Sequence, residues 1–293
     1  MKKGLVRSLV ATVAAGVATV GFAGTAAAAP TGQYAQFAGC PYSNPNVATC
    51  VYSKTTSGSI KLGNKTVPIT SSTPIILRGG LIENADGTQQ FVNAVGADTL
   101  SKTKLKVPGG LIGLVSTGGF TGFLIDVFNA AVADVNDVYA TAELVGGVRF
   151  NLANILGQTG EGVYLPVRIK LENPFLGGGC YIGSASTPVQ LSLTTGTTAP
   201  PPPNTPITGA PGTLLFNNDY TIITDSGVKL VNNSLAVPKA SNCGYLPLDK
   251  ILITAGVNLK VGLPSAAGRN HAILQGDTQL GQAAAVDASD PSN

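Results

Sequence analysis

The stretch VYLPVRIKL, residues 163–171, begins with Val163, ends with Leu171 and has an apolar residue at every odd position. Successive side chains of a strand point to opposite faces, so this alternation predicts a β-strand with one buried face. Pro166 lies inside the pattern. Because proline has no backbone N–H for a strand ladder, it predicts an edge position or a bulge at this point.

The same period of two recurs at 189–193, at 257–263 and at 105–107, where Lys104 and Lys106 alternate with the apolar residues. Glycine and proline turn signals separate these runs at short intervals. Many short alternating stretches divided by turns are typical of antiparallel all-β proteins. The sequence therefore predicts a mainly β fold, an antiparallel β-sandwich or an open barrel.

One segment departs from this period. Between Phe120 and Val138 the apolar residues recur at spacings of three and four, which is the repeat of a helix with one apolar face. We expect one amphipathic helix at about 120–138 that covers the sheet or an open barrel end. The apolar stretch Leu111–Phe128 is also where we expect any peripheral contact with a membrane or lipid.

The N-terminus has the three parts of an export signal. Lys2, Lys3 and Arg7 precede an apolar run from residue 9 to residue 22. That run is shorter than the roughly 20 residues that span a bilayer, which favours a cleaved signal over an anchor. Small residues are required at the −3 and −1 positions, so we expect residues 1–28 to be the signal and cleavage to fall near Ala28/Ala29.

Export removes the net charge of the chain. Of its 18 Lys and Arg, three lie in the signal, which leaves 15 bases against 15 Asp and Glu. A formally neutral protein has no electrostatic basis for binding nucleic acid, so we expect no nucleic-acid partner. The mature chain is expected to be secreted, either extracellular or associated with the cell wall or envelope.

Four cysteines, Cys40, Cys50, Cys180 and Cys243, all follow the signal and would reach a compartment where disulfides persist. Three pairings are open. Cys40 and Cys50 enclose a short stretch rich in turn residues, so we favour 40–50 with 180–243. A metal site is the weaker interpretation, because no CxxC spacing occurs and the chain has a single histidine.

The proline-rich run at 199–206 cannot form a helix or a central strand. It is either a linker between two domains or a long surface loop. Because a bond between the third and fourth cysteines would bridge it, we favour the loop and a single secreted β-rich domain over residues 29–293.

Catalytic patterns are weak throughout the sequence. His271 is the only histidine, no GxSxG motif accompanies it, and its neighbours resemble the start of a strand. The paired glycines lack the context of a phosphate-binding loop. We therefore predict no catalytic residue, no cofactor-binding residue, no metal ligand and no cofactor.

Several strings of this sequence resemble strings in another group of proteins: GCPYSNP at 39–45, LGNKTVPI at 62–69, RIKLENPFLGGGCYIGS at 168–184 and VGLPSAAGRNHAIL at 261–274. The same holds for LTTGTTAPPPPNTPITG at 193–209 and NNSLAVPKASNCG at 232–244. Together they resemble a family of uncharacterised secreted proteins of actinobacteria. The resemblance implies export and a common fold. It carries no assigned activity and therefore no functional residue.

The sequence thus predicts a non-enzymatic secreted or envelope-associated β-protein with a binding or structural role and an unknown partner. The alternative is an envelope pore or a carrier of lipid or another apolar ligand. An unrecognised extracellular hydrolase is the third hypothesis. Ligand, oligomeric state and biological role are not determined by these patterns.

Overall fold

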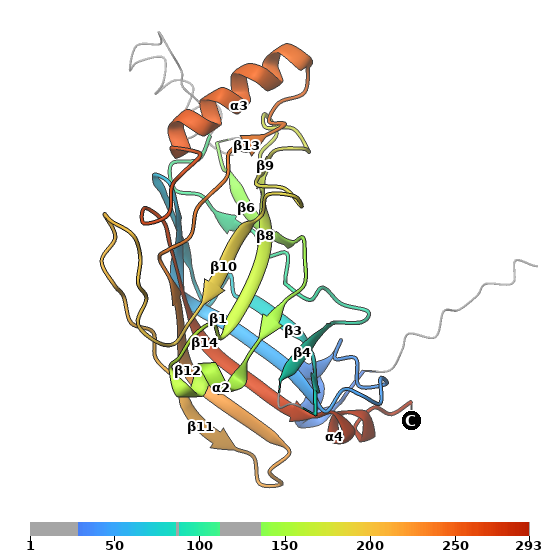
Figure 1. Ribbon diagram of the computed structural model, residues 1–293. Helices are drawn as coiled ribbons and strands as arrows, with labels where there is room; N and C mark the ends of the chain where they lie inside the picture. Colours follow the sequence, from blue (N-terminus) through green and yellow to red (C-terminus); the bar gives the residue numbers. More distant parts are fainter. Residues whose placement is uncertain (1–28, 86–87, 112–135, 293) are drawn as a thin grey trace, which may run out of the picture.

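The computed structural model describes residues 29–85, 88–111 and 136–292. The strands among these residues form two antiparallel sheets that pack face to face and do not close into a barrel (Figure 1). The prediction of a mainly β fold of antiparallel strands is confirmed.

The first sheet is built around β1 and β14, which pair from Thr49↔Gln282 to Lys61↔His271. Its order is β11-β12-β14-β1-β3-β4, with β2 on β1. The strands are β1 (Thr49–Leu62), β2 (Lys65–Ile69), β3 (Ile75–Glu83), β4 (Gln89–Asn93), β11 (Thr213–Phe216), β12 (Ile222–Asn232) and β14 (His271–Gln282).

The second sheet is built around β8, the strand expected at 163–171, whose inward residues are buried as the alternation predicts. Its order is β13-β9-β8-β6-β5, with β10 and β7 also paired to β8. The strands are β5 (Leu105–Lys106), β6 (Tyr139–Leu144), β7 (Arg149–Phe150), β8 (Val163–Glu172), β9 (Tyr181–Ile182), β10 (Val189–Leu193) and β13 (Ala240–Ser241).

The expectation of an edge or a bulge at Pro166 is wrong. β8 is central, and its register with β10 runs through Pro166 without a shift. The carbonyl of Pro166 accepts from Val145 N at 3.0 Å, in the connection between β6 and β7. The N–H and the C=O of a strand residue point towards the same neighbouring strand. The N–H that proline lacks would therefore face the irregular connection between β6 and β7, and the hydrogen bonds between β8 and β10 are not affected.

The two sheets meet on both sides of the core. Thr194, which follows β10, exchanges two backbone hydrogen bonds with Val231 of β12, at 3.0 and 2.8 Å. On the other side Leu100 bridges to Leu77 of β3 shortly before the chain enters β5. A cluster of buried apolar side chains from both sheets fills the space between.

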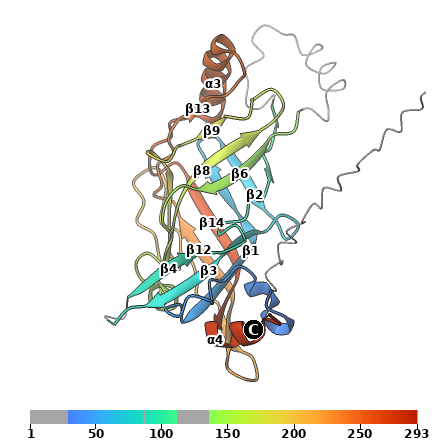
Figure 2. The ribbon, with the colours of Figure 1, turned by 90° about the vertical axis from the view of Figure 1, so that its right-hand side faces the viewer.

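The helices are η1 (Gly32–Phe37), α2 (Leu152–Gly157), α3 (Pro247–Val261) and α4 (Ala283–Ala288). α3 lies at one end of the sandwich and α4 at the other (Figures 1 and 2). No helix in the described ranges is both long and apolar enough to cross a membrane.

α3 corrects one expectation from the sequence. The alternation at 257–263 predicted a strand, but residues up to Val261 are helical, because Val257 and Val261 lie one turn apart on the buried side. The helix expected at 120–138 falls mostly on residues 112–135, which are outside the described residues. Its last part, 136–138, is irregular chain that leads into β6.

Both favoured disulfides are present. Cys40–Cys50 lies in a small apolar cluster with Phe37 and α4, and Cys180–Cys243 joins the start of β9 to the chain before α3. The proline-rich run lies against neighbouring loops, where Asn204 Nδ2 donates to the carbonyls of Asn233 and Asn270 at 2.8 and 2.9 Å. Residues before and after this run contribute to the same core cluster.

Candidate functional site

An apolar cavity lies between the two sheets at the end that carries α3. Twelve of the fifteen side chains that line it are apolar. The first sheet contributes Ile60, Leu62, Val67 and Ile75, the second sheet and the segment around β5 contribute Leu105, Val107, Ala140, Ala142, Ile169, Leu171 and Ile182, and α3 contributes Val261.

Strand alternation builds this wall. Ile60 and Leu62 on β1, and Ile169 and Leu171 on β8, are two residues apart, so each pair points to the same face. On β6 the inward positions are Ala140 and Ala142. Alanine has only a methyl group, so this part of the second sheet is set back from the first and the sheets leave space between them.

The three polar residues at the cavity lie on its β2 and β5 side. Two of them are already paired: Ser101 Oγ accepts from Ile76 N at 2.9 Å, and Thr103 Oγ1 donates to Pro74 O at 2.6 Å. The third is Lys65, which is half-buried and whose Nζ lies 3.5 Å from Pro108 O. A ligand in the cavity would therefore meet hydrocarbon and, at the rim, one ammonium group.

The cavity has a volume of about 60 Å³ for water-sized spheres. At about 10–15 Å³ for each sphere, this equals the space of roughly four to six waters. Water would find almost no polar partner on such a wall, and apolar cavities of this kind stay dry and take up hydrocarbon instead. The space suits the end of an alkyl chain or a small apolar molecule.

The sequence patterns do not reveal this site. Lys65 and Val67 belong to a five-residue strand, and Ala140 and Ala142 belong to a six-residue one, so neither gave a long alternating run. The alternation of Leu105 and Val107 against exposed Lys104 and Lys106 was found and is confirmed, and both apolar residues of that run line the cavity.

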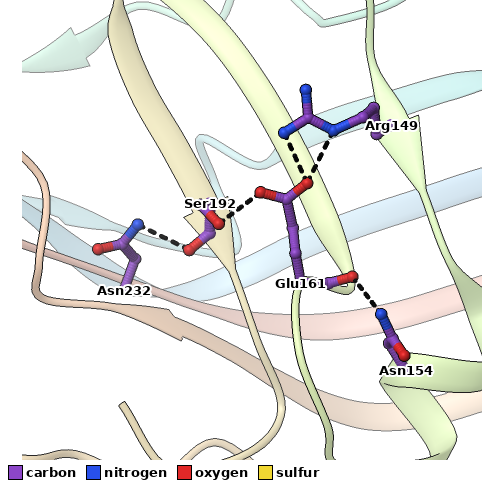
Figure 3. A network of polar contacts seen from close by, with 5 residues as sticks. All are labelled: Arg149, Asn154, Glu161, Ser192 and Asn232. Atoms are coloured by element: carbon purple, nitrogen blue, oxygen red, sulfur yellow. Dashed lines mark hydrogen bonds and ion pairs between the residues drawn. The ribbon is translucent and has the colours of Figure 1, made fainter. Parts of the chain in front are cut away.

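Glu161 is the centre of a polar network away from the cavity (Figure 3). Its carboxylate accepts from Arg149 Nε and Nη2 at 2.8 and 2.7 Å and from Ser192 Oγ. The Ser192 carbonyl accepts from Asn232 Nδ2 at 2.6 Å, and Asn154 Nδ2 donates to the Glu161 carbonyl at 2.9 Å. The network connects β7, β10 and α2 of one layer to the end of β12 in the other.

His271 occupies the first position of β14, as the sequence suggested for the start of a strand. It is half-buried, and its Nε2 lies 3.3 Å from Ser59 Oγ. Burial lowers the pKa of His271, and the positive charge of Lys61 lowers it further. Within the described ranges no three His, Cys, Asp or Glu side chains converge on a point where they could bind a metal ion.

Comparison of the chain with protein-family models, with curated proteins and with solved structures found no match. The resemblance to secreted actinobacterial proteins therefore stays a prediction.

Proposed function

We propose that the chain is exported, loses its signal near Ala28/Ala29 and acts outside the cytoplasm as a non-enzymatic protein that binds an apolar ligand between its sheets. The two disulfides fit an oxidising compartment. The single observation that carries the proposal is the cavity wall, where apolar side chains from both sheets and α3 leave space that water does not favour.

The wall also indicates the kind of ligand. Ligand sites are usually apolar clefts with a small number of placed polar groups. Here the polar group without a strong partner among the described residues is the Lys65 ammonium at the rim, whose hydrogen bond within them is the long one to Pro108 O. A ligand with an alkyl chain and an anionic head satisfies both features, with the chain inside and the head at Lys65.

The test compares binding of a fluorescent fatty acid to wild-type protein and to Ala142→Leu. The larger side chain fills the space beside Ala140. Leucine has three more carbons than alanine and would displace about as many carbons of the ligand, at about 0.8 kcal/mol each, so we expect roughly 60-fold weaker binding. Ala236→Leu is the matched control, because Ala236 is exposed and lies away from the lining residues.

Lys65→Gln tests the position of the head group. This variant should weaken binding of a fatty acid but leave binding of the corresponding alcohol unchanged, because only the acid carries a charge for the ammonium. Wild-type protein that binds neither probe, or an Ala142→Leu variant that binds as tightly as wild type, would refute the proposed site.

A further inference from the structure

α3 carries an apolar stripe on its solvent side. We define this stripe as Leu248, Ile251, Leu252, Ala255 and Leu259, all of which are exposed; the four larger side chains are 66–73% exposed. Their spacings of three and four place them on one face of the helix. Large contiguous apolar surfaces are rare on monomeric proteins and mark sites of association.

The opposite side of α3 is fixed to the body of the protein. Asn258 exchanges two hydrogen bonds with the backbone of Ala240, at 2.7 and 3.0 Å. Thr254 Oγ1 accepts from Cys243 N at 3.0 Å, and Val261 O accepts from Asn64 N at 2.7 Å. α3 cannot roll its stripe inward without breaking these bonds, so the exposure of the stripe belongs to the folded state.

We propose that the stripe on α3 docks this protein on the surface of a lipid bilayer that contains anionic phospholipid. This interaction is independent of the cavity, because it uses the face of α3 that points away from the sheets. A helix with an apolar stripe, charged flanks and a position in the plane of the headgroups is the usual form of interfacial attachment.

The position and the chemistry of α3 both favour a bilayer. α3 lies at one end of the molecule, beyond the strand ends (Figures 1 and 2), and the large side chains of its stripe are exposed there. Tyr245 and Leu246, just before the helix, are 61% and 68% exposed and extend the apolar surface. Tyrosine is enriched at the level of lipid headgroups.

The charges of α3 complement an anionic surface. Lys250 and Lys260 are both exposed, and Lys260, which follows Leu259 of the stripe, is the lysine that can approach an anionic leaflet and add to the attraction. The one acid of the helix, Asp249, is half-buried in the first turn and accepts from Tyr245 N at 3.2 Å. The solvent-facing charge of the helix is therefore positive.

A second copy of the chain is a poorer occupant. A helix of 15 residues is about 22 Å long and about 10 Å wide, which limits the strip that it can offer. Stable dimers bury about 800 Å² on each partner. The stripe is too narrow to supply that area without neighbouring surface, whereas a bilayer imposes no such minimum.

The experiment uses the chain from residue 29, which contains the whole described core, with both disulfides formed. Flotation with vesicles of phosphatidylcholine and phosphatidylglycerol should carry the wild-type protein, and pure phosphatidylcholine should carry less. The variant Leu248→Gln/Ile251→Gln/Leu252→Gln should partition at least about a hundredfold less, because three buried apolar side chains are lost. Glutamine keeps the helix propensity, and Leu214→Gln/Leu215→Gln on exposed β11 is the matched control.

A second measurement does not depend on the triple variant folding. The protein has no tryptophan, so Leu252→Trp introduces a single tryptophan on the stripe and Leu215→Trp one on β11, each of which can be excited selectively over the tyrosines. With vesicles, emission from the first variant should shift to the blue and be quenched by brominated lipid acyl chains, while emission from the second should not change.

Four results would overturn the proposal. The first is wild-type protein that does not float with anionic vesicles, and the second is a triple variant that floats as well as wild type. The third is emission of Leu252→Trp that is already blue and shielded from iodide without vesicles, which would mean that other residues of the chain cover the stripe. The fourth is a dimer, detected by light scattering, that is lost only in the triple variant. Ala142→Leu should float normally, so failure of the cavity and failure of the stripe are separable.

Discussion

Replacing Asp225 with asparagine should stabilise the fold at neutral pH. Asp225 lies on β12 opposite Thr278 and is 2% exposed, and no described residue offers either carboxylate oxygen a well-aligned hydrogen-bond donor. Burial raises the pKa of Asp225 above its usual value, the backbone N–H of Gly212 offsets part of this, and the charge of Asp277 adds to the rise. The charged form is therefore disfavoured in the folded state.

The size of the effect follows from the missing partners. A buried polar group without a partner costs about 1–3 kcal/mol, and more when it is charged. Asparagine removes the charge at nearly constant volume but keeps one carbonyl oxygen in the same place, so we expect a gain near the lower limit, about 1 kcal/mol. In a chain of this size that corresponds to a rise in Tm of about 2–4 °C.

The pH dependence gives the sharper test. Between the usual pKa of 3.8 and the raised value, folded wild-type protein binds more protons than unfolded protein, so its stability falls as pH rises through this window. The advantage of Asp225→Asn should be complete above the window and should disappear as pH falls towards 3.8.

Urea unfolding, followed by circular dichroism at several pH values with the disulfides intact, measures this difference. Asp219→Asn is the matched control, because Asp219 is exposed in the turn before β12 and its charge is not among those that raise the pKa of Asp225. A surface substitution of this kind should change stability by less than about 0.5 kcal/mol. An Asp225→Asn variant that is less stable than wild type, or more stable by the same amount at every pH, would refute the reasoning.

Other predictions concern the disulfides and the C-terminus. Loss of the Cys180–Cys243 disulfide, which spans 63 residues, should cost about 4 kcal/mol, and loss of Cys40–Cys50, which spans 10, about 3 kcal/mol; denaturant unfolding of the paired alanine variants measures both. Equal costs would contradict the loop-entropy basis of this difference. Tyr42 Oη donates to Asp290 at 2.6 Å, which lowers the pKa of Asp290. Burial, and after it this hydrogen bond, raises the pKa of Tyr42 to about 12. The stability from Asp290 is present above pH 3.8 and lost as pH falls through its lowered pKa, so Tyr42→Phe should lose less stability on acidification than wild type; an identical acid transition would contradict this.

The strands could be predicted where one face is buried and the other is exposed to solvent. β8 and β10 have this property, because inward Val167 and Leu191 are buried while outward Arg168 and Gln190 reach solvent. Alternation of this kind is local and needs no knowledge of the partner strand. The disulfide pairing could also be predicted. The short loop between Cys40 and Cys50 favoured a bond between them, which left one pairing for the other two cysteines, and both bonds are present.

α3 could not be recognised by the same reasoning, because apolar residues lie on both of its sides. Val257 and Val261 face the core while Leu259 faces solvent, and read in sequence these three alternate as in a strand. The terminal signals were more informative: Pro247 is at the first position of the helix, and Gly262 follows its last residue with φ 74°. Proline at the start and glycine just after the end are the common asymmetry of helices.

The cavity could not be predicted because it is a tertiary property. It depends on Ala140 and Ala142 of β6 facing Ile60 and Leu62 of β1, and nothing local to either strand reveals the other. The same pattern with leucine on β6 would predict the same fold but fill the space. Small residues at inward positions are thus compatible with a tight contact or with a cavity, and only the opposite wall distinguishes them.

The anchoring of α3 explains how one short helix can serve both proposals. Thr254 and Asn258 attach it by hydrogen bonds to backbone near β13, and Cys243, which bonds Thr254, is linked covalently to Cys180. The chain at Cys180 is held in turn by β8, where Leu171 N donates to Cys180 O at 2.9 Å. A helix held in this way does not need its second apolar side to be buried, so Val257 and Val261 can face the core while the stripe stays outside. A force applied to the exposed side of α3 would then act through the Cys180–Cys243 disulfide on β8, the central strand of the second sheet, and not on the loop before α3 alone.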